Sequence, residues 1–228
     1  MQNTQRVDRV YCLPPDLLVE QIRAVVEDIP PDAAKIGALG NLEVLLAVAK
    51  IAGEFRFPLV VDPVMISKHG APLMSPEARS AFLDRLAPRA TLITPNLFEA
   101  AALTGEAIAS VDGMRRAAER LCRLGARAVL VKGGHLQGMA TDVLLADGKF
   151  YEYEAARVDT PNTHGTGCTY SAAITACLAA GCALPEAVRR SKQFITEAIR
   201  TNPGLGKGNG PVNHHVRARS SIHELETE

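Results

Sequence analysis

Two hydrophobic patterns alternate along this chain. In the longer segments apolar residues recur every three or four positions, which is typical of a helix with one buried face. Between them lie short, unbroken apolar runs, which are typical of strands covered on both faces of a sheet. The first pattern predicts helices at residues 15–27, 42–55, 97–103, 111–124, 167–180 and 185–200, and one that opens at Ser75. The second predicts strands at residues 33–36, 58–62, 90–94 and 128–132.

Repeated alternation of strand and helix favours an α/β fold, with a mostly parallel sheet covered by helices on both faces. Local signals support these elements. Asn41 occupies the N-cap position of the helix at 42–55. Asp147-Gly148, which joins two polar-flanked runs at 141–146 and 149–155, predicts a β-hairpin.

The composition narrows the class of protein. Apolar residues make up 47% of the 228 positions, so a sizeable core can form, and no internal repeat or long linker interrupts it. We expect one domain over residues 1–213 and a frayed tail at 214–228. Twenty-five basic residues balance 25 acidic ones, which gives no electrostatic footprint for nucleic acid or for a membrane surface.

The opening residues are polar and of mixed charge, unlike a secretion signal, and no apolar stretch reaches membrane-spanning length. Five cysteines, an odd number without a CxxC pair, indicate reduced thiols rather than disulfides or a zinc site. We therefore expect a cytoplasmic protein that contacts neither nucleic acid nor a membrane.

Polar residues follow several of the expected strands. In open parallel sheets, ligands bind beyond the carboxyl ends of the strands. Asp62, Asn96, Lys132 and Asp159 all occupy such positions in the expected order of elements. For each of them the alternative is a loop residue that caps a neighbouring helix.

The segment from Asp159 to Cys168 is the most informative stretch. Gly165 and Gly167 allow close backbone approach just before a helix begins, and the free N–H groups of a helix start form an anion site. A phosphoryl group is the natural occupant, because its negative charge is spread over its oxygens. In the first helical turn Cys168 favours the thiolate form, which could accept a proton from a substrate hydroxyl. The alternative is a glycine-rich loop with a small buried cysteine.

These features belong to a set of short motifs. Asp62-Pro-Val-Met65, Thr94-Pro-Asn96, Glu99, Lys132-Gly-Gly-His135 and His164-Gly-Thr-Gly-Cys168 follow one another along the chain. Together they resemble the hydroxymethylpyrimidine/phosphomethylpyrimidine kinases of thiamine biosynthesis, within the ribokinase-like superfamily. The resemblance extends from Gln2 to His214. It implies a ribokinase-like three-layer α-β-α fold with a mostly parallel central sheet, and the use of ATP and Mg²⁺.

The resemblance also implies residue roles. Cys168 corresponds to the catalytic base, and Lys132 would neutralise phosphate charge, although a lysine at the edge of the core is its alternative. Glu99 and Asp62 would hold Mg²⁺, with a helix-capping carboxylate as the alternative for Glu99. The remaining roles are an anion hole for the γ-phosphate, formed by Gly165, Thr166 and Gly167, and a pyrimidine pocket that includes Gln2 and Val64.

The reaction implied is ATP-dependent phosphorylation of 4-amino-5-hydroxymethyl-2-methylpyrimidine and then of its monophosphate. A pyridoxal-type vitamin kinase is the alternative within the same fold, and relatives are commonly homodimers. Ala38 stands where the family more often has methionine against the ring, and residues 68–70 follow the Asp62 motif as a candidate flap.

One departure concerns the start of the chain. The family's first strand–turn–helix unit normally precedes the Gln-Asn-Thr segment that begins here at Gln2. We expect an N-terminally shortened fold with apolar edge and helix faces exposed. Either the natural chain is longer, or the short form is a catalytically impaired protein that binds pyrimidine or nucleotide.

Overall fold

The sheet is the centre of the molecule. The computed structural model describes residues 1–65 and 74–216 and contains a six-stranded sheet in the order β1-β2-β3-β4-β5-β6. The first four strands are parallel, whereas β5 and β6 are antiparallel to their preceding neighbours. The strands are β1 (Ala34–Ile36), β2 (Leu59–Val61), β3 (Leu92–Ile93), β4 (Val129–Val131), β5 (Asp142–Ala146) and β6 (Lys149–Tyr153).

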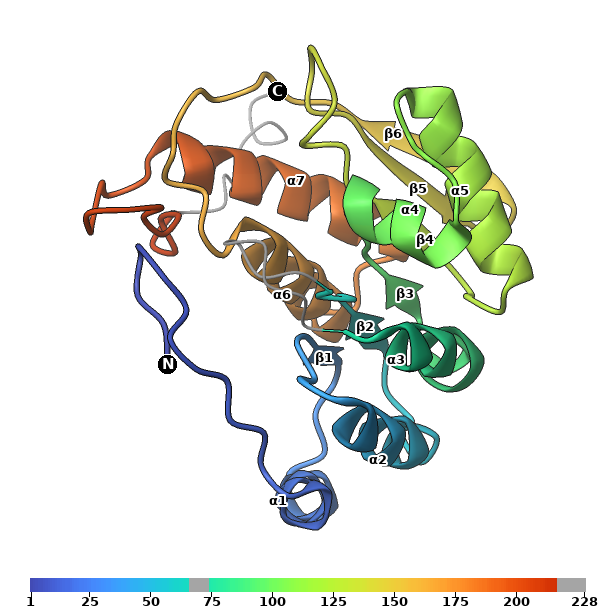
Figure 1. The fold of residues 1–228 in the computed structure, drawn as a ribbon. Helices are drawn as coiled ribbons and strands as arrows, with labels where there is room; N and C mark the ends of the chain where they lie inside the picture. Colours follow the sequence, from blue (N-terminus) through green and yellow to red (C-terminus); the bar gives the residue numbers. More distant parts are fainter. Residues whose placement is uncertain (66–73, 217–228) are drawn as a thin grey trace, which may run out of the picture.

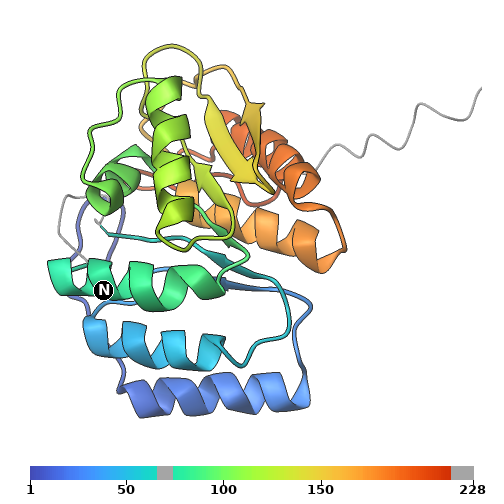
Figure 2. The ribbon, with the colours of Figure 1, turned by 90° about the vertical axis from the view of Figure 1, so that its right-hand side faces the viewer.

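Helices cover both faces of this sheet, which gives three layers (Figure 1). On one face lie α2 (Leu42–Ala52), α3 (Pro76–Ala81), α4 (Leu97–Thr104) and α5 (Val111–Arg123). On the other lie α6 (Thr166–Ala179) and α7 (Leu184–Arg200). The remaining helix, α1 (Pro15–Asp28), packs outside α2, so that α1, α2 and α3 form a stack (Figure 2).

Alternate residues of each strand feed two hydrophobic cores. In β2, Leu59 and Val61 face the core beneath α2–α5, whereas Val60 faces the core beneath α6 and α7. In β4 the same alternation places Val129 and Val131 in the first core, and all of these side chains are buried. Strands covered on both faces must be apolar at every position, which is why they read as unbroken hydrophobic runs.

The sequence-based prediction of the α/β fold class is confirmed. Asn41 caps α2 by accepting a hydrogen bond from the Val44 backbone N–H at 2.8 Å. At the tip of the β5–β6 hairpin, Asp147 and Gly148 have φ angles of 49° and 72°, the left-handed values that a tight hairpin turn requires. Every expected helix and strand is present, with ends shifted by a few residues.

The helix that opens at Ser75 is less regular than its pattern predicted. After α3 the chain continues as a π-helical turn, Phe82–Leu86, and then a 3₁₀ turn, Ala87–Arg89. Pro88 lies inside this last turn and cannot donate an α-helical hydrogen bond, which explains the change of geometry.

The expected exposure of apolar helix faces is observed. β1 is one of the two edge strands of the sheet, and α6 exposes a row of small residues, Ala172, Ala176 and Ala179. Leu17 and Val25 of α1 are also exposed. Within residues 1–65 and 74–216 no helix is long and apolar enough to span a membrane. The candidate flap at 68–70 and most of the expected tail lie outside the described residues.

Candidate active site

Three neighbouring strands end side by side and bring their following residues together. The ladder of backbone hydrogen bonds continues past the strand ends, where the Asp62 N–H donates to the Ile36 carbonyl and the Lys132 N–H to the Pro95 carbonyl, each at 2.9 Å. Asn96 and Lys132 form an isolated parallel bridge. The register of β2, β3 and β4 therefore places these polar residues together at the carboxyl ends of the strands.

Asp62 and Lys132 form a buried ion pair at these strand ends. The Lys132 Nζ lies 2.7 Å from Asp62 Oδ1, and the two side chains are only 12% and 3% exposed. Thr94 Oγ1 donates a hydrogen bond to the same oxygen at 3.1 Å. Burial by itself would lower the pKa of Lys132, but the negative charges of Asp62 and Glu99 outweigh it and raise that pKa. Lys132 is therefore positively charged at neutral pH.

Glu99 lies beside this pair and closes the first turn of α4. The Asn96 side chain accepts from the Glu99 N–H at 2.9 Å, and Glu99 Oε2 accepts from the Asn96 N–H at 2.8 Å, a reciprocal capping box. The helix-capping alternative for Glu99 is therefore observed. Burial, only partly opposed by the charge of Lys132, raises the pKa of Glu99 to about 7.

The first turn of α6 faces the same strand ends. Gly165 is the N-cap residue with a φ of 80°, a left-handed value that favours glycine. Gly167 follows in the first turn, where an added Cβ would lie 3.2 Å from the Lys132 Nζ and 3.7 Å from Asp62 Oδ2. The α6 amides and the Asp62–Lys132 pair therefore border one space.

Cys168 is exposed in that first turn, and a negative charge on its sulfur acts on Lys132 by raising the pKa of the amine. Thr166 is fixed by its hydroxyl, which donates to the Thr163 carbonyl at 2.8 Å. The alternative of a buried structural cysteine is therefore wrong. The helix start instead presents a thiol together with the backbone N–H groups of its first turn. One of these, the Thr166 N–H, already donates to the Thr163 carbonyl at 3.3 Å.

A second, later segment supports the glycine-rich loop, and sequence reasoning did not find its contacts. The His164 N–H donates to the Gly210 carbonyl at 3.0 Å, and the Asn162 side chain accepts from the Gly210 N–H at 3.0 Å. Asn162 also donates to Asn202 Oδ1 at 2.8 Å. The amide side chain of Asn162 was the available signal, because such side chains commonly bond backbone groups in loops.

The two residues expected in the pyrimidine pocket lie in different places. Val64 is partly buried and lies two residues after Asp62, with its N–H donating to the Asp62 carbonyl at 2.8 Å. Gln2 lies on the N-terminal segment, where it lines an apolar cavity of about 320 Å³ together with Ala38 and Cys12. None of the residues lining that cavity comes from the cluster around Lys132.

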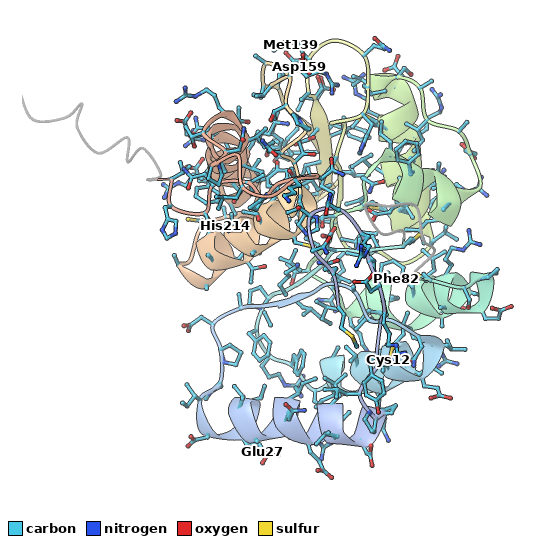
Figure 3. All side chains as sticks on the ribbon, turned by 60° about the vertical axis from the view of Figure 1, so that its left-hand side comes forward. Cys12, Glu27, Phe82, Met139, Asp159 and His214 are labelled. Carbon is cyan, nitrogen blue, oxygen red and sulfur yellow. The ribbon has the colours of Figure 1, made fainter. Side chains whose placement is uncertain are left out.

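Asp159 was expected at a strand end, and that expectation is wrong. β6 ends at Tyr153, and Asp159 lies on the exposed loop that follows. Figure 3 shows Asp159 and Met139 at the same end of the molecule, at the top of the view. The chain needs a long connection from β6 to reach α6, and Asp159 is part of that connection rather than of the site.

The oxygen donors at the strand ends suit a hard cation. Mg²⁺ is usually bound by one or two carboxylates together with substrate phosphates and water. Asp62 and Glu99 supply two buried carboxylates next to the space bordered by α6. In the described part of the chain no three acidic, histidine or cysteine side chains form a cage of their own for a metal ion.

Comparison with known proteins places the chain among vitamin kinases. Residues 1–213 match the family model described as phosphomethylpyrimidine kinase. A thiamine biosynthesis bifunctional protein, ThiED, from Geobacter sulfurreducens is 47% identical over 95% of this chain, which spans only 45% of that relative. A hydroxymethylpyrimidine/phosphomethylpyrimidine kinase from Haemophilus influenzae is 44% identical, with 96% of this chain and 83% of the relative covered.

A solved structure gives the same placement. The ADP complex of a Bacillus subtilis pyridoxal kinase superimposes with a TM-score of 0.83 and 38% sequence identity. The match covers 90% of this chain and 78% of that kinase. The arrangement of layers described above is therefore that of the ribokinase-like kinases.

Proposed function

The chain belongs to the phosphomethylpyrimidine kinase family, and we propose that it transfers the γ-phosphoryl group of ATP to 4-amino-5-hydroxymethyl-2-methylpyrimidine and then to the resulting monophosphate. The observation that carries the proposal is the space shared by the first turn of α6 and the Asp62–Lys132 pair. A helix start and a buried cation on the two sides of one space favour an anion that carries several charges.

Each group around this space then has a chemical task. The backbone N–H groups of Gly165, Thr166 and Gly167 hold the oxygens of the phosphoryl group, whose charge they stabilise during transfer. For the Thr166 N–H this requires exchanging its present bond to the Thr163 carbonyl, 3.3 Å long, for a phosphate oxygen. Lys132 remains charged because Asp62 and Glu99 surround it, and it neutralises the same group. Cys168 accepts the proton of the substrate hydroxyl as the oxygen–phosphorus bond forms.

Asp62 and Glu99 are the residues that would hold Mg²⁺, partly through water. The ion would supply additional positive charge against the phosphate oxygens. The carboxylate of Glu99 already accepts hydrogen bonds from the Asn96 N–H, through Oε2, and from the Met65 backbone, so that Glu99 would reach the ion through water. A cation near Glu99 would also favour its ionised form.

The acceptor pocket is proposed to include Val64 beside Asp62, and Gln2 with Ala38 on the N-terminal segment. A small residue at Ala38 leaves room for a different ring substituent. The similarity to a pyridoxal kinase supports pyridoxal as a second candidate acceptor, because it too carries a hydroxymethyl group on an aromatic ring. We further propose a homodimer that works in the cytoplasm; the exposed Leu17 and Val25 of α1 support self-association.

A competition assay tests the proposal. The purified chain is incubated with MgATP and equal concentrations of the hydroxymethylpyrimidine, its monophosphate and pyridoxal, and the products are separated by mass. We expect the pyrimidine monophosphate and diphosphate to form first. Preferential formation of pyridoxal phosphate would replace the proposed acceptor by the second candidate. Absence of all phosphorylated products, with ATP still binding, would indicate the impaired binding protein.

A further inference from the structure

A second buried ion pair lies behind the site and has no part in the proposed chemistry. Lys192 of α7 places its Nζ 2.7 Å from Asp142 Oδ2 at the start of β5. The same Nζ donates to the Ala140 carbonyl at 2.7 Å. The two side chains are 10% and 4% exposed. Removing two charges from water is costly, and an apolar pair of similar size would often stabilise a fold as well.

The other oxygen of Asp142 reaches the segment that carries Lys132. Asp142 Oδ1 accepts a hydrogen bond from the Gly133 N–H at 2.9 Å, within the protein interior. Gly133 follows Lys132 directly, and an added Cβ at Gly133 would lie only 1.9 Å from the Thr141 carbonyl oxygen. The backbone after Lys132 is therefore pressed against β5 and held there by the Asp142 carboxylate.

The same carboxylate also lies close to α6. Tyr170 is 3% exposed, and its hydroxyl lies beside the Asp142 carboxylate. Burial and then the negative charge of Asp142 raise the pKa of this hydroxyl. Tyr170 belongs to the turn of α6 next to Thr166, Gly167 and Cys168. Asp142 therefore contacts the backbone beside Lys132 and lies near the helix that provides the proposed anion hole.

We propose that Asp142 is a positioning residue for Lys132: its carboxylate fixes the Gly133 amide and hence the place of the Lys132 ammonium against the first turn of α6, and Lys192 supplies the charge that lets this carboxylate be buried. The pair touches neither substrate nor phosphate. The expected effect on catalysis rests on the proposed function. The expected effect on the Gly133 amide does not, because it concerns the folded structure alone.

Two double variants separate positioning from stability. Asp142→Asn with Lys192→Met removes both charges but retains an oxygen for the Gly133 N–H. Asp142→Leu with Lys192→Met removes the same charges and also that oxygen. Neither variant leaves a buried charge without its partner, so both avoid the main cause of misfolding. If the Leu form melts below the assay temperature, Asp142→Ala replaces Asp142→Leu.

Ile195→Ala is the matched control for lost stability. Ile195 is buried on the same helix as Lys192 and packs in the apolar core, where truncation destabilises the fold without altering a polar contact. For every variant we measure kcat, the KM for ATP, and amide hydrogen exchange of the peptide that contains Gly133.

We expect the Asn form to retain a kcat close to that of the wild type. The Leu form should have a kcat about 10- to 100-fold lower with little change in KM, because small displacements of a catalytic group cost that much. Exchange at Gly133 should be faster in the Leu form alone. Equal kcat and equal exchange in the two double variants would overturn the proposal. If the wild type transfers no phosphoryl group, the proposed function fails, and the exchange difference still decides the positioning role.

Discussion

Gly167→Ala is the substitution for which the structure predicts opposite effects on stability and activity. Gly167 lies in the first turn of α6, and its φ is not in the left-handed region. The backbone therefore accepts alanine without strain. The added Cβ would lie 3.2 Å from the Lys132 Nζ, which is closer than an ordinary van der Waals contact, and 3.7 Å from Asp62 Oδ2.

The size of each effect follows from this geometry. Alanine is up to about 1 kcal/mol more favourable than glycine within a helix, so the free energy of unfolding should stay constant or rise. The methyl group narrows the space between the α6 amides and Lys132, whose ammonium is held at 2.7 Å from Asp62 and has little freedom to withdraw. We expect kcat to fall about 100-fold, which corresponds to about 2.7 kcal/mol of transition-state stabilisation.

Gly113→Ala provides the matched control. Gly113 also lies in the first turn of a helix, α5, has no left-handed φ, and would place its Cβ 3.4 Å from the nearest atom, the Ile108 side chain. Both variants are compared with the wild type by urea unfolding and by steady-state transfer from ATP. The reasoning is refuted if Gly167→Ala retains the activity of Gly113→Ala, or if its lost activity merely follows a loss of stability.

Two further predictions concern Glu99 and Cys168. Because the pKa of Glu99 rises from 4.5 unfolded to about 7 folded, the folded state binds the proton more tightly, and stability falls as pH rises from about 5 to 8. Glu99→Gln keeps the Asn96 cap but does not titrate. Unfolding curves should therefore show the stability of this variant, relative to the wild type, increasing by about 2.5 kcal/mol from about pH 5 to pH 8. A difference that stays constant with pH would contradict the raised pKa. Cys168→Ala should slow transfer to the hydroxymethyl acceptor by about 100-fold or more and slow transfer to the monophosphate less, because the second acceptor is already anionic. The two rates are measured by separating the monophosphate and diphosphate products. Comparable losses in the two steps would rule out a base at Cys168.

The elements of this fold could be predicted because their signals are local. Val129–Val131 reads as a strand covered on both faces, and the Asp147-Gly148 dipeptide specifies a hairpin wherever it joins two strands. The turn at Phe82–Leu86 was missed because the interruption comes from Pro88, several residues further along the chain.

The site was predictable only in part. Asp62 and Lys132 were found because they follow parallel strands, whose carboxyl ends must meet. The ion pair between them, and the hydrogen bond that Thr94 donates to Asp62, depend on the register between the strands. The ion pair of Asp142 with Lys192 depends in addition on the rotation of α7 about its axis. Nothing in the local sequence specifies these quantities. Asp159 was misplaced for the same reason, since the length of the loop after β6 decides where it lies.

The most direct test of the account is the rate of a single turnover with Lys132→Gln. Glutamine can still donate a hydrogen bond to Asp62 but carries no positive charge, and a circular dichroism melt establishes that the variant is folded. The enzyme is in excess over radiolabelled ATP, and the hydroxymethylpyrimidine is present at a saturating concentration. Under these conditions we expect the variant to transfer the γ-phosphoryl group at least about 100-fold more slowly than the wild type. A folded Lys132→Gln variant that transfers phosphate at the wild-type rate would contradict a phosphoryl site between Lys132 and α6.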